Sequence, residues 1–132
     1  MIKKLLAIVF VAGMIGVSCS KEEGKGGTNT IKGSVTVWEY NKDFTQKIGE
    51  YPGQDIDVYI VYGNDEIYGD RFQTGADGKY EFTYLREGSY SVYALSKDTN
   101  NLLTNELVPV VKTLEVSGKK QVVEVPEIIV ID

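Results

Sequence analysis

The segment TGADGKYEFTYLREGSYSVYA, Thr74–Ala94, carries the clearest structural signal in this chain of 132 residues. It contains Asp77–Gly78, a pair typical of tight turns because both residue types tolerate positive φ. After this turn, Tyr80, Phe82 and Tyr84 alternate with polar residues, which is the two-residue period of a strand with one buried face. The segment therefore predicts a hairpin at the Asp-Gly pair and a strand whose aromatic face joins the core.

The same alternation recurs through the chain after residue 30. It predicts strands within residues 30–40, 55–62, 79–85, 89–96, 110–116 and 121–132. The residues expected to face inward are Ile31, Gly33, Val35, Val37, Ile56, Val58, Ile60, Tyr62, Tyr90, Val92 and Ala94. Residues 41–54 lack the pattern and are expected to form a long loop. Since no segment after Val17 shows a 3.6-residue period, the pattern predicts an all-β sandwich or barrel.

The composition argues against several classes of function. The chain has no His and one Cys, and its net charge is −5. The absence of His removes the commonest general base and zinc ligand, and a single Cys allows no intramolecular disulfide. An acidic chain without a basic run is poorly suited to nucleic-acid binding.

The N-terminus has the organisation of a signal peptide. Lys3 and Lys4 precede the uncharged apolar run Leu5–Val17, which is followed by small residues and then Cys19. A run of this length suits a signal peptide, whereas a membrane-spanning helix needs about 20 apolar residues. Residues 1–18 are therefore expected to be a cleaved signal peptide.

The four residues Gly16–Cys19 resemble the lipobox of bacterial lipoproteins, with Gly16 in place of the usual Leu. The resemblance implies that Cys19 becomes the first residue of the mature protein and carries a diacylglycerol and an N-acyl chain. Two or three chains give durable membrane anchoring. No other cofactor is expected. The alternative, a free or buried thiol, suits the charged residues after Cys19 poorly.

Three charged residues follow, Lys21, Glu22 and Glu23. They resemble the surface-export signal of Gram-negative bacteria that display lipoproteins on the outer face of the outer membrane. The alternatives are a solvated tether without a signal and the periplasmic face of that membrane. Residues 19–29 are polar and Gly-rich, so they are expected to form a flexible tether, with one domain at residues 30–132.

The central segment also resembles the carboxypeptidase-regulatory-like, transthyretin-like family of β-sandwiches. The matching residues are Thr74, Asp77, Gly78, Tyr80, Phe82, Leu85, Gly88, Tyr90, Val92 and Ala94, and the upstream IKGSV and DIDVYIV resemble the first two strands of that family. This resemblance implies a single seven-stranded Greek-key sandwich in which Leu85 and Tyr90 fill the core. Such domains serve as stalks, adaptors and cell-surface accessories, and the motif specifies a scaffold rather than a reaction.

Acidic residues offer two further hypotheses. Asp55 and Asp57 share a strand face, as a pair of glycosidase carboxylates would. The loop acids Asp65, Glu66, Asp70 and Asp77 offer oxygen ligands for Ca²⁺. A charged outer face and turn-forming Asp residues explain both sets more simply. No catalytic or metal site is therefore predicted, and the chain is not expected to be an enzyme.

Aromatic residues supply the remaining hypothesis. Trp38, Tyr59 and Tyr93 fall on the outward parity of their predicted strands. Exposed rings stack on sugars or anchor protein partners, whereas packing beneath a loop is the structural alternative. The sequence thus predicts a binding or structural accessory lipoprotein of the cell envelope with a protein partner. The alternative is a carbohydrate-binding lipoprotein of a glycan-uptake system.

Overall fold

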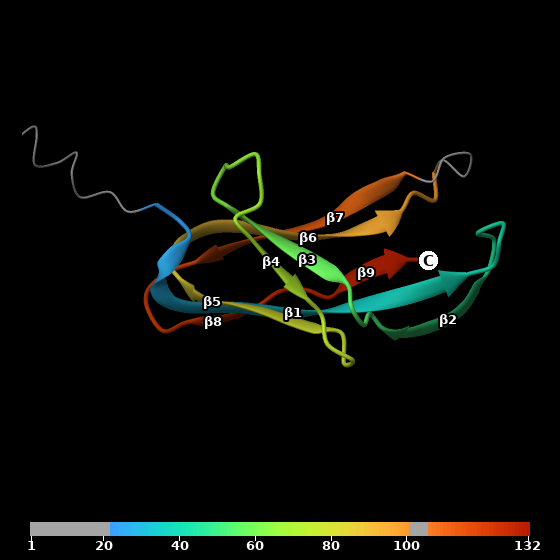
Figure 1. The fold of residues 1–132 in the computed structure, drawn as a ribbon, viewed down its shortest axis with the longest axis horizontal. Coiled ribbons are helices and arrows are strands. Elements are labelled where there is room, and N and C mark those ends of the chain that lie inside the picture. Colours follow the sequence, from blue (N-terminus) through green and yellow to red (C-terminus); the bar gives the residue numbers. More distant parts are fainter. Residues whose placement is uncertain (1–21, 101–105) are drawn as a thin grey trace, which may run out of the picture.

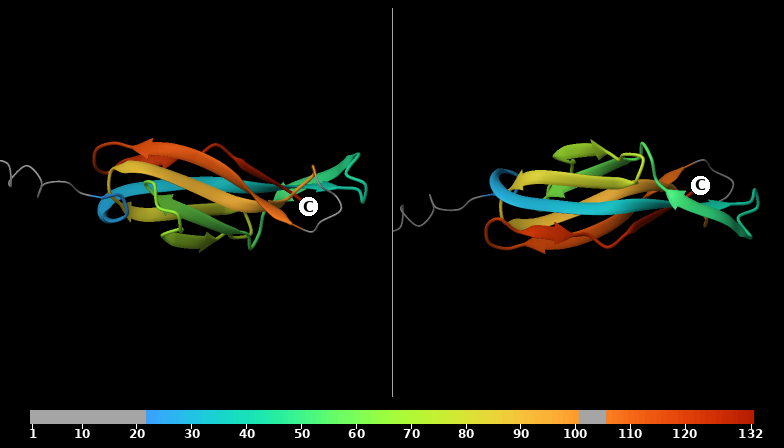
Figure 2. Two further views of the ribbon diagram at one scale, coloured as in Figure 1. Left: turned by 90° about the horizontal axis from the view of Figure 1, so that it is seen from above. Right: turned by 90° about the horizontal axis from the view of Figure 1, so that it is seen from below.

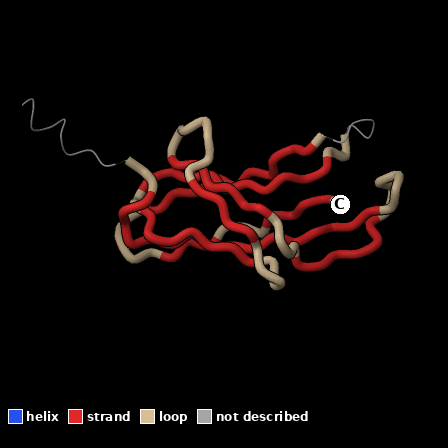
Figure 3. The backbone as a smooth tube through the Cα atoms, viewed as in Figure 1, coloured by secondary structure: helices blue, strands red, loops and turns tan. Residues whose placement is uncertain are grey.

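The computed structural model describes residues 22–100 and 106–132, which form two β-sheets without a helix among them (Figures 1 and 3). The nine strands are β1 (Lys25–Tyr40), β2 (Lys47–Pro52), β3 (Asp57–Tyr62), β4 (Asp70–Gln73), β5 (Lys79–Leu85), β6 (Gly88–Lys97), β7 (Leu107–Val116), β8 (Val122–Glu124) and β9 (Ile128–Ile131). The prediction of an all-β sandwich is confirmed. In these described ranges, no helix is long and apolar enough to cross a membrane.

Strand β1 is the centre of the five-stranded sheet. Its first half lies between β5, antiparallel, and β8, parallel. Its second half lies between β2, antiparallel, and β9, parallel. The second sheet has four strands in the order β4-β3-β6-β7. The two views in Figure 2 look onto the outer faces of the two sheets in turn.

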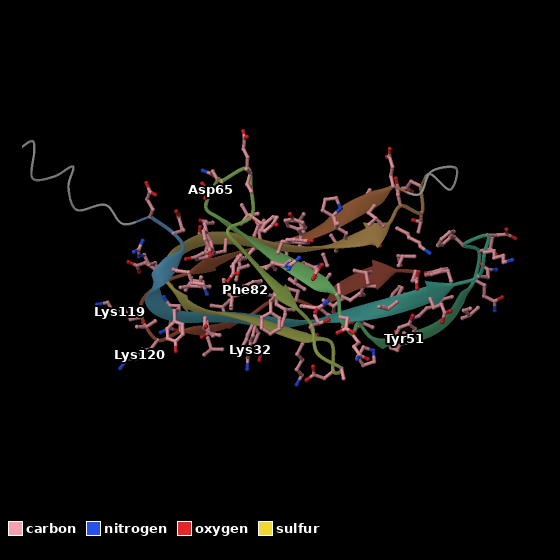
Figure 4. The ribbon with its side chains drawn as sticks, in the orientation of Figure 1. Lys32, Tyr51, Asp65, Phe82, Lys119 and Lys120 are labelled. Atoms are coloured by element: carbon pink, nitrogen blue, oxygen red, sulfur yellow. The ribbon has the colours of Figure 1, made fainter. Side chains whose placement is uncertain are left out.

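The core lies between the sheets and follows the predicted alternation. Val35 and Val37 of β1 are buried, as are Val58 and Ile60 of β3. Phe82, whose side chain lies between the two layers in Figure 4, packs with its ring edge-on to Phe72 at a centroid distance of 6.3 Å. Most of the expected inward set is buried or partly buried, including Tyr90, Val92 and Ala94.

One aromatic residue breaks the alternation. Tyr84 was expected inside, but its φ is 57° and its side chain is 71% exposed. The positive φ lies where the β1–β5 register shifts opposite Leu85. Leu85 is fully buried in its place. The prediction for Tyr84 was wrong because a backbone irregularity moves the inward position to the next residue.

The predicted hairpin at Asp77–Gly78 is also wrong in its pairing, although the turn is present. Gly78 has φ 74°, and the Asp77 carboxylate accepts a hydrogen bond from the Lys79 amide at 3.0 Å. The strands on either side belong to different sheets, since β4 pairs with β3 and β5 pairs with β1. The amide of Val35 donates to the Gly78 carbonyl at 2.8 Å, so β1 holds the turn that crosses between the layers.

The structure has nine strands where seven were expected. The predicted loop at 41–54 contains β2, and the C-terminal run splits at Pro126 into two short strands, because proline cannot donate to a ladder. The strand β1 begins at Lys25, five residues before the expected start of the domain. Little of the Gly-rich segment therefore remains outside the sheet.

The long edge strand β7 carries two features that oppose pairing with another chain. Among the described residues, only β6 pairs with it. Pro109 has no amide hydrogen to donate. Lys112 falls on the inward parity, opposite the buried Val92. An inward charge and a proline are features that protect natural edge strands.

Two buried tyrosine hydroxyls differ in their partners. Tyr90 Oη accepts from the Gly24 amide at 3.0 Å and donates to the Arg86 carbonyl at 2.6 Å. Tyr80 is 2% exposed, and its hydroxyl has no hydrogen-bond partner among the described residues. It lies against Gly33, where a Cβ atom would come within 2.5 Å of the hydroxyl. The Tyr80 hydroxyl therefore makes no hydrogen bond that would offset the free-energy cost of removing it from water.

We expect Tyr80→Phe to leave the free energy of unfolding unchanged or to raise it by about 1 kcal/mol, because the substitution removes an unpartnered polar atom. Tyr90→Phe should lower it by about 1–3 kcal/mol, because it leaves Gly24 and Arg86 without their partner. Urea unfolding of the two variants measures both values. An equal loss in both would contradict the assignment.

Burial also raises the pKa of Tyr80 well above its usual value of 10. The unfolded chain therefore releases the phenolic proton first, and the contribution of Tyr80 is present below about pH 10 and falls as the pH rises above it. Tyr80→Phe should flatten this alkaline loss of stability.

Candidate functional site

The three aromatic residues singled out from the sequence do not share one face. Trp38 lies on β1 of the five-stranded sheet, with its neighbour Val37 turned into the core. Tyr59 and Tyr93 are paired across β3 and β6 of the four-stranded sheet, next to the buried Val58 and Val92. The outer faces of the two sheets point in opposite directions. A single surface formed by Trp38, Tyr59 and Tyr93 is therefore wrong, because the parity argument could not assign strands to sheets.

One face of the Trp38 ring is covered by a lysine. The Nζ atom of Lys47 on β2 lies 3.8 Å from the centroid of its ring, in the geometry of a cation–π contact. The same ammonium forms an ion pair with Glu50 at 2.8 Å and holds the pKa of that exposed carboxyl below its usual value. A ring face occupied in this way is not free to stack on a ligand.

Tyr59 and Tyr93 form a different group with Tyr68. The rings of Tyr59 and Tyr93 stack with centroids 5.0 Å apart and planes 20° apart. Tyr68 belongs to the loop between β3 and β4, and its ring centroid lies 4.7 Å from that of Tyr59. This loop rises over the sheet and carries Asp65 at the top of Figure 4. Three rings from two strands and a loop therefore form one row.

The ring faces of Tyr59 and Tyr93 turn toward one another. Two rings lying side by side in one plane would need centroids further apart than 5.0 Å, so the Tyr59–Tyr93 pair is stacked rather than flat. Burial raises the pKa of Tyr93, and the nearby hydroxyls of Tyr59 and Tyr68 raise it further. Tyr59 and Tyr93 each have one ring face against the other, while Tyr68 is 44% exposed.

Exposed aliphatic side chains continue the row across the outer face of the sheet. Val111 on β7 pairs with Tyr93 and is 48% exposed. Leu95 and Leu107 follow on the same outward parity and are 40% and 54% exposed. We call this surface, formed by Tyr59, Tyr68, Tyr93, Leu95, Leu107 and Val111, the tyrosine face. Contiguous exposed apolar surface of this kind is typical of interaction sites.

A groove adjoins the far end of the tyrosine face. It has a volume of about 470 Å³, and Leu95 and Leu107 are among the residues that line it. Tyr51 of β2, labelled in Figure 4, and Val130 of β9 line it from the other sheet. Its lining is mainly apolar, so it extends the apolar surface to the end of the sandwich opposite the start of β1.

A second groove of about 690 Å³ is bordered by charges of both signs. Lys32 and Glu124 form an ion pair at 3.6 Å on its rim, and Asp77, Lys79 and Glu81 also line it. These side chains are largely solvated, and salt screens such contacts. The arrangement has the character of an ordinary charged surface rather than a site with converging carboxylates.

The acidic residues considered for chemistry lie on β3 and β4 and in the loops beside them, and three of them have separate partners. Asp57 lies 4.0 Å from Arg71, and Asp70 lies 3.5 Å from Lys25. Asp77 accepts the turn hydrogen bond from Lys79. Within residues 22–100 and 106–132, no cluster of three or more His, Cys, Asp or Glu side chains could hold a metal ion.

The signal and anchor residues lie mostly outside the described part of the chain. The signal peptide, Cys19 and Lys21 are not among the described residues, so the lipidation of Cys19 stays a prediction. Glu22 and Glu23 are the first two described residues, and Glu23 is half-buried against the domain.

Several residues of the tyrosine face were absent from the sequence prediction. Leu95 and Val111 have the same outward parity as Tyr93, so their pattern was readable once the strand pairing was known. Tyr68 lies in a loop, where alternation carries no information. Only the fold of that loop over the sheet brings its ring to Tyr59.

No protein-family model matches this chain, and no curated protein matches it. Among solved structures, it is similar to a protein from Pseudomonas aeruginosa described as a "putative carbohydrate binding protein", with 12% identity and a TM-score of 0.46. The match covers 83% of this chain and 91% of the other. A DUF3823 family protein from Bacteroides uniformis is 22% identical with a TM-score of 0.30, over 74% of this chain and 43% of that one. Similarity at this level assigns no function.

We expect a double-mutant cycle on unfolding to show the tyrosine pairing. Tyr59→Ala and Tyr93→Ala should be coupled by about 0.5–1.5 kcal/mol, because each ring loses its stacking partner. Tyr59→Ala and Trp38→Ala should be additive within about 0.5 kcal/mol, because they lie on opposite faces. Strong coupling of Trp38 with Tyr59 would contradict their placement on opposite faces of the sandwich.

Proposed function

We propose that this chain is a lipid-anchored, non-enzymatic binding module of the bacterial cell envelope, and that it holds a protein partner on the tyrosine face. The observation that carries this proposal is the continuity of that face. Three neighbouring tyrosine rings, two of them stacked, lead directly into exposed Val111, Leu95 and Leu107. Tyrosine is enriched in protein interfaces because it combines a large apolar area with a hydroxyl.

The stacking of the rings favours a protein over a glycan. A sugar stacks on an open aromatic face, whereas the Tyr59 ring is stacked with Tyr93 and has the tilted ring of Tyr68 at a centroid distance of 4.7 Å. Tyrosine side chains set among aliphatic ones suit a mixed apolar and hydrogen-bonding protein surface better. Trp38 lies on the other sheet, and Lys47 covers one face of its ring.

The proposed contact uses the face of the sheet and not its edge. Pro109 and the inward Lys112 of β7 oppose the addition of a strand from another chain. The outward side chains of the same strand, Leu107 and Val111, are exposed. A partner that lies across β3, β6 and β7 would bury these side chains without pairing with the edge.

The anchor is supported by the N-terminal sequence. A short basic segment, an apolar run and Gly16–Cys19 together favour acylation at Cys19 and attachment to the outer membrane. Lys21, Glu22 and Glu23 favour display on the cell surface, with the periplasmic face as the alternative. A non-enzymatic role is supported by the lack of His in the sequence. It is also supported by the separate pairing of Asp57 with Arg71 and of Asp70 with Lys25.

A photo-crosslinking residue at Val111 should give a discrete protein adduct in intact cells, because this position lies in the middle of the proposed contact. The matched control is Glu81, which is exposed on β5 of the other sheet and should give none. Adding Leu95→Glu should abolish the adduct at Val111 by placing a charge in the apolar contact. Adduct mass spectrometry and immunoblotting provide the readout.

Equal adducts from both positions, or an adduct that survives Leu95→Glu, would contradict the proposed surface. A glycan array of the soluble domain separates the two ligand classes. If the array shows selective glycan binding and Tyr93→Ala abolishes it, the ligand of the tyrosine face is a carbohydrate and not a protein.

Cys19→Ala should abolish acylation and leave a precursor that still carries residues 1–18, because the thiol is the expected attachment point. Metabolic labelling with a fatty acid and intact-mass measurement test this. Protease treatment of intact cells reports which side of the membrane the domain faces. Acyl label in the mutant would refute the anchor at Cys19. The proposed role of the tyrosine face does not depend on this result.

A further inference from the structure

The first described residues are bound to the end of the sandwich rather than free of it. The buried Gly24 donates its amide hydrogen to Tyr90 Oη at 3.0 Å and accepts from the Arg86 amide at 2.8 Å. The Arg86 guanidinium also donates to the Glu22 carbonyl at 3.4 Å. These contacts fix the chain three residues before β1 begins.

The Glu23 side chain fits against two glycines. A Cβ atom at Gly63 would lie 2.8 Å from its carboxylate, and one at Gly88 would overlap its Cγ atom. Both glycines have positive φ, 57° and 145°, which other residues rarely adopt. We call the site formed by Gly63, Arg86, Gly88 and Tyr90 the Glu23 seat.

The connection from the seat to the expected anchor is very short. Only Ser20 and Lys21 separate Cys19 from Glu22. At about 3.3–3.6 Å per residue, the Cα atoms of Cys19 and Glu22 can be at most roughly 11 Å apart. An acylated Cys19 lies at the membrane surface, so the seat must lie next to it.

The charge distribution favours that end over the sides of the sandwich as the surface that meets the lipids. Lys119 and Lys120 project at the end where the described chain starts (Figure 4). Arg86 and Lys25 are nearby, together with Glu22, Glu23, Glu87 and Asp70, which pairs with Lys25, so this end is nearly balanced in charge. From residue 22 onward, the chain has 11 basic and 19 acidic residues, so its sides are repelled by anionic lipids.

We infer that the anchored domain stands upright on the membrane, with the Glu23 seat against the lipid headgroups and β1 running away from the surface. This inference rests on the proposed anchor at Cys19. The strand β1 runs from the seat end to the opposite end of the molecule (Figure 1). From Lys25 to Trp38, it spans roughly 40 Å at about 3.3 Å per residue. The tyrosine face begins at the loop that follows Gly63 of the seat and extends along β6 and β7 away from the membrane surface.

Two residues of the chain can serve as probes of its orientation on a membrane. Cys19 is its only cysteine and Trp38 its only tryptophan. The protein from Cys19 onward, whose described residues hold both sheets and the whole core, is coupled through the Cys19 thiol to maleimide lipid in vesicles that contain anionic and dansyl-labelled lipid. Energy transfer from Trp38 to the dansyl groups should be weak, because upright β1 holds the tryptophan far from the surface.

Two variants should raise this transfer several-fold. Inserting Gly-Ser-Gly-Ser between Lys21 and Glu22 lets the folded domain tilt, and Gly88→Val displaces Glu23 from its seat. The matched control is Gly118→Ala, where φ is also positive, at 88°, but the nearest side-chain atoms lie 4.0 Å away. It should behave like the unmodified protein. The insertion leaves the domain itself unchanged, so it decides the test if Gly88→Val fails to fold.

Strong transfer in the unmodified protein would overturn the upright posture. Weak transfer in both the unmodified protein and the insertion variant would overturn the role assigned to the short connection. Since the coupling is chemical, the outcome does not depend on acylation in cells. A failure of the Cys19→Ala labelling experiment would therefore refute the natural anchor, whereas a failure here would refute the posture.

Discussion

The two-sided pairing of β1 is the constraint on which the rest of the molecule depends. This one strand of 16 residues is bonded to β5 and β8 along its first half and to β2 and β9 along its second. Its carbonyl and amide at Val35 also hold Gly53 and the turn at Gly78. Two of the connections between the sheets, β2–β3 at Gly53 and β4–β5 at Gly78, are therefore held by β1, which places β3 and β4 over the core.

This arrangement puts the two proposed contacts on different parts of the domain. One end holds Glu22, Glu23 and Gly24, close in sequence to the expected lipid attachment. The outer face of the four-stranded sheet gathers Tyr59, Tyr68 and Tyr93 with exposed aliphatic residues. The proposed membrane contact and the proposed partner contact thus lie on different surfaces, which meet near the loop that follows Gly63.

Alternation in the sequence was sufficient where a strand is regular. Val58, Ile60, Val92 and Ala94 are buried as their period predicts, because burial on one face of a strand is a local property. It failed at Tyr84, where positive φ shifts the parity by one residue. It also failed at residues 41–54, since β2 lacks a buried face and so leaves no hydrophobic period.

The sequence by itself determined the all-β class, the core-facing residues of the regular strands and the turn at Asp77–Gly78, all of which arise from interactions between near neighbours in the chain. Only the tertiary structure decided which strands share a sheet. It placed Trp38 on a different sheet from Tyr59 and Tyr93. It also brought the ring of Tyr68 to Tyr59 and the side chain of Glu23 to Gly63 and Gly88. These contacts join residues far apart in sequence, and parity along one strand contains no information about which other strand lies beside it.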